Sequence, residues 1–299
     1  MQFIFSYPEV QGRERDMLEA GPIADIAAAA EEAGWAGFAL TEHPVPSVKW
    51  LEAGGHQALD PFVALGHAAA RTTRLKLITK LSVSPYRNPF LLAKAAMTVD
   101  RLSDGRFILG IGAGYLRSEF RALGVDFEER NALFDETLDT LALHWSGEPF
   151  SYDGTHFVAR DVIGLPRPTQ NPIPIWIGGN SRLSRQRVAE KAQGWMPLLG
   201  SAEMATTSRT AAITSTDQLA ARIAELHSLA GPRAHQLDIV VGYYDQSIVA
   251  HPDRDVARHQ ERLEELEKLG ATWTTVSGNQ TSPDDTLAFL ANFGATYIS

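Results

Sequence analysis

One histidine and one glycine-rich turn are the residues of this chain best suited to chemistry. His43 follows an apolar stretch at 35–40 that predicts a buried strand, and an imidazole takes up or releases a proton near neutral pH. The Gly-Gly-Asn-Ser turn at 178–181 stands between an apolar stretch and a predicted helix. Free N–H groups at a helix start attract anions, so this turn indicates phosphate binding. Both features also have a purely structural interpretation. The histidine would hydrogen-bond to a backbone group, and the turn would be a glycine hinge with a serine N-cap.

Two carboxylates stand near these candidates. Glu42 precedes His43, where it would act as a base or orient a neighbour, and a purely structural role is favoured for it. Glu119 belongs to a predicted helix after residue 115, and we expect it to be solvated or salt-bridged. The nine histidines show no metal-binding spacing and the chain has no cysteine, so the sequence predicts no metal site.

The stretch 100–115 indicates which fold positions these groups. Its apolar run at 107–111 predicts a parallel strand buried on both faces, and Gly110, Gly112 and Gly114 would let a ligand approach the backbone closely. The stretch does not match the Rossmann dinucleotide fingerprint Gly-x-Gly-x-x-Gly, because the position of its last glycine is occupied by Tyr115 or by Arg117. The alternative is one strand of a (β/α)8 barrel whose loop lies at the mouth of the active site.

Strand and helix patterns alternate eight times along the chain. This tally predicts an α/β fold, a (β/α)8 TIM barrel with loop insertions, as a single domain over residues 1–299. A hairpin around Asp153-Gly154 is predicted within an insertion at about 147–172, and the polar stretch 201–214 is predicted as a loop. A helix start with a capping box is predicted at Asp126 and Glu129. The predicted strands are 3–5, 35–40, 75–79, 107–111, 174–177, 194–199, 237–243 and 272–276.

Composition limits the partners and the compartment. The 299 residues are 44% hydrophobic and 21% charged, as in an ordinary globular protein, and the net charge of −9 argues against binding nucleic acid or an anionic membrane. No run approaches the length of a membrane span, and no signal peptide is apparent. With no cysteine present, the sequence fits a cytoplasmic protein.

Several stretches in this order resemble the luciferase-like monooxygenase superfamily, and more closely its deazaflavin-dependent oxidoreductases. The resemblance is strong over residues 1–198 and weak beyond them. It implies a flavin-type ring at the carboxyl-terminal mouth of the barrel. It also implies a homodimer and a small organic substrate. The stretches are Leu-Thr-Glu-His at 40–43, 87–94, 102–114, Leu-Arg-Ser-Glu-Phe at 116–120, 174–181 and Gly-Trp at 194–195.

Family residues carry over by position. His43 matches the family's catalytic histidine, and a non-proline cis peptide is expected within 79–82, although a lysine at position 80 is unusual there. Tyr115 stands where sugar-phosphate dehydrogenases have a proton-donating glutamate, so that activity is not expected. The residues implied to bind the cofactor are Thr79, Lys80, Leu81, Gly112, Tyr115, Gly178, Gly179, Asn180 and Ser181.

Three functions stay open at this point. The leading hypothesis is an oxidoreductase that transfers a hydride between reduced deazaflavin coenzyme F-420 and a small organic substrate. The second is an FMNH2-dependent monooxygenase that uses dioxygen and a separate flavin reductase, with FMN as its cofactor. The third is a non-catalytic barrel that binds a flavin or another ligand. The cofactor would supply the chemistry in both enzymes, while the protein positions and polarises it.

Overall fold

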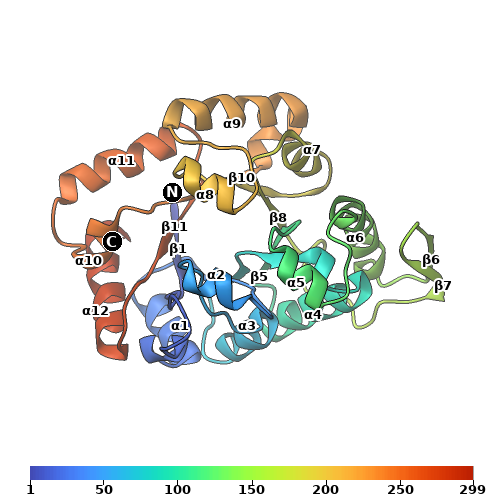
Figure 1. Cartoon of the computed structure of the whole chain (residues 1–299), viewed down its shortest axis with the longest axis horizontal. Coiled ribbons are helices and arrows are strands. Elements are labelled where there is room, and N and C mark those ends of the chain that lie inside the picture. The colour runs from blue at the N-terminus through green and yellow to red at the C-terminus, as the bar shows by residue number, and fades with distance from the viewer. Residues whose placement is uncertain (299) are drawn as a thin grey trace.

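The computed structural model describes residues 1–298, and its parallel strands close into a barrel surrounded by helices (Figure 1). The sheet runs β3-β2-β1-β11-β10-β9-β8-β5, and β3 pairs with β5 to complete the circle. The predicted (β/α)8 TIM barrel is therefore confirmed. The barrel strands are β1 (Gln2–Ser6), β2 (Gly37–Leu40), β3 (Lys76–Thr79), β5 (Phe107–Gly112), β8 (Ile175–Gly178), β9 (Gly194–Met196), β10 (Asp238–Gly242) and β11 (Trp273–Ser277).

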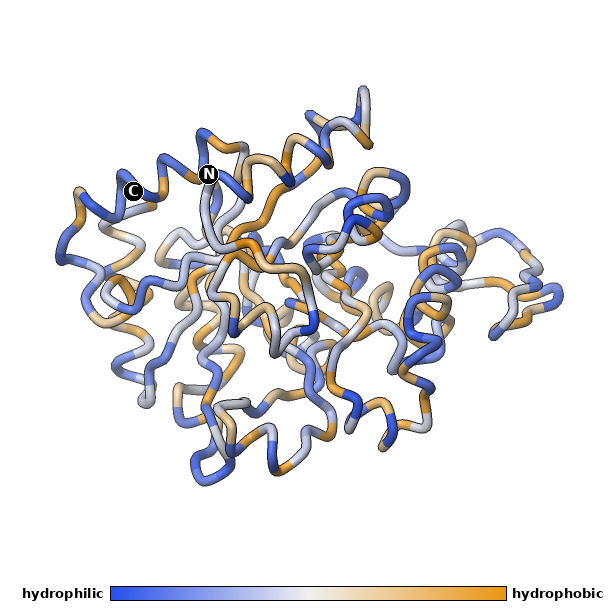
Figure 2. The backbone as a smooth tube through the Cα atoms, turned by 45° about the horizontal axis from the view of Figure 1, so that its top comes forward, coloured by the Kyte–Doolittle hydropathy of each residue, from blue (hydrophilic) through white to orange (hydrophobic). Residues whose placement is uncertain are grey.

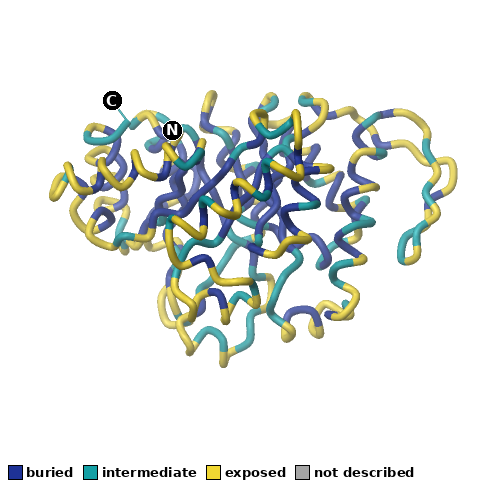
Figure 3. The backbone as a smooth tube through the Cα atoms, turned by 90° about the horizontal axis from the view of Figure 1, so that it is seen from above, coloured by how far each residue is buried: buried dark blue, intermediate teal, exposed yellow. Residues whose placement is uncertain are grey.

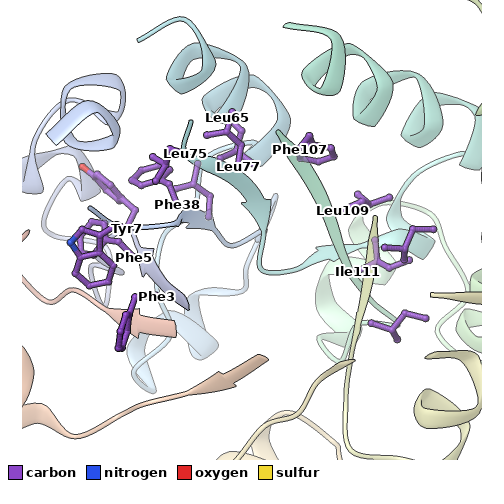
Figure 4. Close-up of a cluster of buried hydrophobic side chains, with 14 of the residues drawn as sticks. Phe3, Phe5, Tyr7, Phe38, Leu65, Leu75, Leu77, Phe107, Leu109 and Ile111 are labelled. Atoms are coloured by element: carbon purple, nitrogen blue, oxygen red, sulfur yellow. The ribbon is translucent and has the colours of Figure 1, made fainter. Parts of the chain in front are cut away.

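Side chains that alternate along the strands fill two separate layers. One set packs inside the barrel: Ile4, Ala39, Ile78, Ile108, Trp176, Met196, Val240 and Trp273. The other set faces outward and packs beneath the helices, as the rings of Phe3, Phe5, Phe38 and Phe107 do in Figure 4. Because both faces of each strand are buried, the strands are apolar almost throughout.

The helices cover the outside of this barrel, and hydrophobic and hydrophilic residues alternate along them (Figure 2). Asp60 and Asn88 cap two helices that begin with proline, as the sequence predicted. No helix within residues 1–298 is long and apolar enough to cross a membrane. The helices are α1 (Ile23–Glu32), α2 (Val48–Glu52), α3 (Pro61–Ala69), α4 (Pro89–Leu102), α5 (Arg117–Ala122), α6 (Arg130–Trp145), α7 (Arg182–Lys191), α8 (Ala202–Thr207), α9 (Thr216–Ala230), α10 (Gln246–Ala250), α11 (Val256–Lys268) and α12 (Pro283–Phe293).

Two local predictions are wrong. Helix α6 begins at Arg130 without a side-chain cap, because the Asp126 carboxylate accepts from the Glu128 N–H in a turn and Phe127 packs against Phe120. The polar stretch 201–214 contains α8, which Ser201 caps. Two antiparallel strands, β6 (Phe150–Asp153) and β7 (Val158–Val162), lie within the predicted insertion, and most of their residues stay partly or fully exposed (Figure 3).

Two glycines of β5 differ in what surrounds them. A Cβ at Gly110 would overlap the Thr79 carbonyl oxygen, whereas a Cβ at Gly112 would meet only the flexible Cδ1 end of Leu81, 2.5 Å away. We expect Gly110→Ala to lower the free energy of unfolding by about 3 kcal/mol, because backbone cannot move aside. We expect Gly112→Ala to cost less than about 1 kcal/mol, because Leu81 can rotate. Urea denaturation of both variants measures this, and equal losses would contradict it.

Glu31 ties the end of α1 to the segment before β3. Its carboxylate accepts from the N–H groups of Thr73, Arg74 and Leu75. Burial would raise the pKa of Glu31, but these hydrogen bonds outweigh it and hold the pKa at about 2. Because the folded-state pKa is depressed, the stabilisation is complete above about pH 4.5 and is lost as the pH falls through about 2.

We therefore expect Glu31→Gln to cost roughly 1–2 kcal/mol of unfolding free energy at pH 7. This deficit should shrink steadily as the pH falls below about 4.5. The exposed neighbour Glu32→Gln is the matched control. Denaturant unfolding between pH 2.5 and pH 7 provides the measurement, and a deficit that does not change with pH would contradict the role of the carboxylate.

Candidate active site

A cavity of about 620 Å³ opens at the carboxyl-terminal ends of the barrel strands. It lies where ligands bind in parallel (β/α)8 barrels. Its size is that of a pocket for a cofactor or a drug-sized molecule. Most of the residues predicted to form the site line it: His43, Lys80, Leu81, Gly112, Tyr115, Gly178, Gly179 and Ser181.

His43 is held in this cavity by a buried carboxylate. Its Nδ1 lies 3.2 Å from Oε2 of Glu119, whose side chain is 0% exposed. Glu119 also accepts from the Tyr86 hydroxyl at 2.9 Å and from the Val45 N–H at 3.3 Å. A carboxylate only accepts hydrogen bonds, so Nδ1 carries the proton and Nε2 is free to act as an acceptor. None of residues 1–298 is hydrogen-bonded to that Nε2.

Glu119 was expected to be solvated or salt-bridged; it is not solvated, and it pairs with His43. It lies in the first turn of α5, beside the exposed Arg117 and Ser118, yet it points inward. Burial, together with the Glu119 charge, raises the pKa of Tyr86, so its hydroxyl stays protonated and keeps donating to the carboxylate. His43 and Glu119 belong to the stretches 40–43 and 116–120 that carry the family resemblance, but neither stretch shows that the two side chains meet.

Aromatic rings lie close to the His43 imidazole. The Trp50 ring centroid lies 4.5 Å from that of His43, and the His56 ring stands edge-on at 4.9 Å. Trp50 belongs to the short helix α2, and Gly55 lacks a Cβ that would overlap its ring. Burial, with Glu119 and Glu9 nearby, raises the pKa of Tyr115 to about 12, so its hydroxyl is a donor at neutral pH.

The bulge after β3 forms one wall of the cavity. The peptide between Lys80 and Leu81 is cis, as expected from the family resemblance. The Leu81 side chain lies between Gly112 and Gly178, each of which lacks a Cβ that would overlap it. Glu42 holds this bulge, because its buried carboxylate accepts from the Ser82 hydroxyl and the Val83 N–H, both at 2.7 Å. These contacts give Glu42 the structural role that was favoured for it, and Glu42 also lines the cavity.

The turn after β8 divides its residues between the cavity and the scaffold. Gly178, Gly179 and Ser181 line the cavity, and Ser181 caps α7 by accepting from the Ser184 N–H. Asn180 is 1% exposed, and its side chain binds the backbone of Leu198 and Ala211.

Thr79 is similarly engaged by the scaffold, since its hydroxyl donates to the Gly110 carbonyl at 2.7 Å. Thr79 and Asn180 thus lie behind the lining formed by the described residues, and their contact with a cofactor stays a prediction.

A model of the luciferase-like monooxygenase family matches residues 1–295. The chain belongs to this family. In the structure, His43 and the glycine-rich turn after β8 line the same cavity at the barrel mouth.

Relatives of this luciferase-like chain fall into two cofactor groups. It is 27% identical over 243 residues to a protein of Microbacterium testaceum named F420-dependent glucose-6-phosphate dehydrogenase, covering 80% of the chain and 67% of the relative. It is 26% identical over 222 residues to the FMNH(2)-dependent dimethylsulfone monooxygenase of Pseudomonas putida, covering 73% and 56%.

An uncharacterised protein of Mycobacterium tuberculosis is 33% identical over 141 residues, which are 47% of this chain. The match spans about half of that relative's length, 50%.

Solved structures support the luciferase-like barrel. The monooxygenase RslO1 from Streptomyces bottropensis superposes with a TM-score of 0.79 at 21% identity, covering 100% of this chain and 99% of that one. An F420-dependent secondary alcohol dehydrogenase superposes with a TM-score of 0.73 at 14% identity, covering 99% and 98%. At these identities the superpositions show the fold.

Proposed function

We propose that this protein transfers a hydride between coenzyme F-420 and a small organic substrate. The observation that carries the proposal is the orientation of His43, whose Nδ1 is bonded to Glu119 while its Nε2 remains free beside the cavity. Hydride transfer at a carbon requires a proton at the adjacent heteroatom, and an imidazole in this state is suited to exchange it.

The residues present fit a planar cofactor with an anionic tail. Gly112 and Gly178 leave room for Leu81 to form a smooth apolar wall. The Thr275 hydroxyl is buried in the lining and has no partner among residues 1–298, so it is available to a polar ring edge. Ser181 lines the cavity at the start of α7, where the N–H groups of the first helical turn favour a phosphate, although the N–H groups of Gly179 and Asn180 are bonded within the protein.

Each protein group has a defined part in the proposed reaction. When bound, the deazaflavin ring supplies the site of hydride exchange. In the reducing direction, protonated His43 gives its Nε2 proton to the substrate heteroatom, and in the reverse direction neutral His43 takes that proton back. Glu119 keeps Nδ1 protonated and stabilises the positive ring while it carries both protons. Trp50 and Tyr115 flank the imidazole.

A glucose-6-phosphate substrate is not part of the proposal. Tyr115 occupies the position at which the resemblance places the glutamate of sugar-phosphate dehydrogenases, and its pKa of about 12 makes it a hydrogen-bond donor that stays protonated. The mostly apolar and aromatic groups beside His43 favour a small, partly apolar molecule.

FMNH2-dependent monooxygenation is the second candidate. It is supported by the relative of that class, which matches 73% of the chain. A reduced FMN would be held by the same groups, namely His43, the cavity wall formed by Leu81 and the turn between β8 and α7. A separate reductase would supply the electrons.

Fluorescence titration of the purified protein with FMN and coenzyme F-420, in parallel, tests the proposal. We expect tight binding of F-420 and weak binding of FMN, followed by substrate reduction under nitrogen. Tight binding of reduced FMN, with oxygen consumed as product forms, would overturn the proposal in favour of oxygenation. Binding without turnover for either cofactor would indicate a non-catalytic barrel.

A further inference from the structure

Three guanidinium groups surround one phenylalanine ring at the edge of the cavity. Their Cζ atoms lie near the centroid of Phe127, at 3.9 Å for Arg130, 4.1 Å for Arg117 and 5.8 Å for Arg209. They come from α6, from α5 and from the segment after α8. Arg130 and Arg209 line the cavity itself. We call Arg117, Arg130 and Arg209 the arginine cluster.

The positive charge of this cluster is only partly compensated. Glu128 pairs with Arg117 at 2.7 Å and lies 3.9 Å from Arg130. No carboxylate among residues 1–298 pairs with Arg209. Glu128 is thus the one carboxylate of residues 1–298 that pairs with the three guanidinium groups, in a chain whose net charge is −9. The neighbouring carboxylates are engaged elsewhere, since Asp126 accepts from the Glu128 N–H and Glu129 lies 3.3 Å from His156. Such an excess of positive charge at the edge of a cavity favours an anionic ligand.

Two features show that holding these charges together has a cost. Burial lowers the pKa of Arg130, and the charges of Arg117 and Arg209 lower it further, although Glu128 opposes them. Arg209 also has a φ of +49°, in the left-handed region that side chains other than glycine seldom occupy. Covering Phe127 alone would need one guanidinium. An anion between the arginines would offset the electrostatic cost.

The phosphate expected in this cavity already has another site. The start of α7 presents the N–H groups of its first turn, while the N–H groups of Gly179 and Asn180 are already bonded to the Met196 carbonyl and the Thr210 hydroxyl. Arg187 also lines the cavity, but Asp135 engages it through two hydrogen bonds, at 2.7 Å and 3.0 Å. A phosphate bound at the start of α7 therefore does not require the arginine cluster.

FMN and coenzyme F-420 differ in what lies beyond the phosphate. FMN ends there, whereas F-420 continues through a phosphodiester into a lactyl group and a chain of glutamyl carboxylates. We propose that the arginine cluster binds these carboxylates and so favours the deazaflavin over FMN, an inference that rests on the proposed function. Arginine suits this task because its planar fork matches a carboxylate.

The test compares Arg209→Gln with Arg121→Gln. Arg121 lies on α5, is exposed and is outside the cavity lining, so its variant removes the same charge without touching the cluster. Each protein is titrated with F-420 and with a form of F-420 that has the phosphate and lactyl group but no glutamyl residues. We expect Arg209→Gln to raise the Kd of F-420 about fivefold and to flatten its salt dependence. The trimmed cofactor should bind all three proteins equally well.

The outcomes separate this inference from the proposed function. If the wild-type protein binds F-420 tightly and Arg209→Gln binds it equally well, the cluster inference is wrong and the proposed function stands. If Arg209→Gln weakens both forms equally, the cluster serves the phosphate and the inference is again wrong. If the wild-type protein binds FMN and neither deazaflavin, the proposed function is wrong, and the cluster inference, which rests on it, is wrong as well.

Discussion

Replacing His43 with asparagine should lower kcat by about 10²- to 10⁴-fold, the range expected when a general acid–base is removed. Asparagine preserves much of the volume of the ring but transfers no proton. Binding of the cofactor should change little, because the α7 turn and the Leu81 wall remain intact. Steady-state turnover and a fluorescence titration on the same preparation give kcat and Kd separately.

His67→Asn is the matched control, since His67 lies exposed on α3 and outside the cavity lining. Unchanged kcat in His43→Asn across a panel of substrates would remove His43 from the reaction.

The buried partner of His43 should change the same reaction in a different way. Glu119→Gln keeps an oxygen that can accept from Nδ1 but removes the charge that stabilises the doubly protonated ring. We expect kcat to fall about tenfold while the Kd of the cofactor stays unchanged. A merely structural role would lower the free energy of unfolding and leave kcat of the folded protein in place.

The sequence located the strand ends but not the way in which the site is assembled. The alternation of apolar strands and amphipathic helices, together with glycines at 110, 112 and 178, was enough to predict a barrel and to place His43 at its mouth. These features are local, so they can be read along the chain. Thr79 and Asn180 lie at the predicted strand ends too, but pleat and loop geometry turn their side chains toward backbone partners.

Glu119 shows why the remaining part was missed. On a short helix beside Arg117 and Ser118, a glutamate has the pattern of a surface residue. Its burial depends on Tyr86 and on the N–H of Val45, from loops 33 and 74 residues away in the chain. The arginine cluster joins Arg117 and Arg130, which lie within ten residues of Phe127 in the chain, to Arg209, which lies 82 residues beyond it. Such tertiary convergence leaves no spacing in the sequence that could be recognised.

The second large effect is expected on stability, at the carboxylate that holds the β3 bulge. Glu42 is 4% exposed, and besides Ser82 and Val83 it pairs with the Arg87 guanidinium, whose Nη2 also lies 2.7 Å from Asp60. Removing the Glu42 carboxylate leaves the Val83 N–H and the Ser82 hydroxyl without this acceptor and leaves Arg87 with the partly exposed Asp60 as its ion-pair partner. We expect Glu42→Ala to lower the free energy of unfolding by about 3 kcal/mol.

Asp60→Asn is the informative control for this ion-pair network. An asparagine keeps the side-chain oxygen that caps α3 through the N–H groups of Phe62 and Val63, and it removes only the outer charge next to Arg87. Because that outer pair is partly exposed, the loss should stay near 1 kcal/mol or less, about a third of the loss from Glu42→Ala. Denaturant unfolding of both variants gives this ratio. Equal losses would mean that Glu42 acts only as a surface ion pair and that the wall of the cavity is held by packing of Leu81 instead.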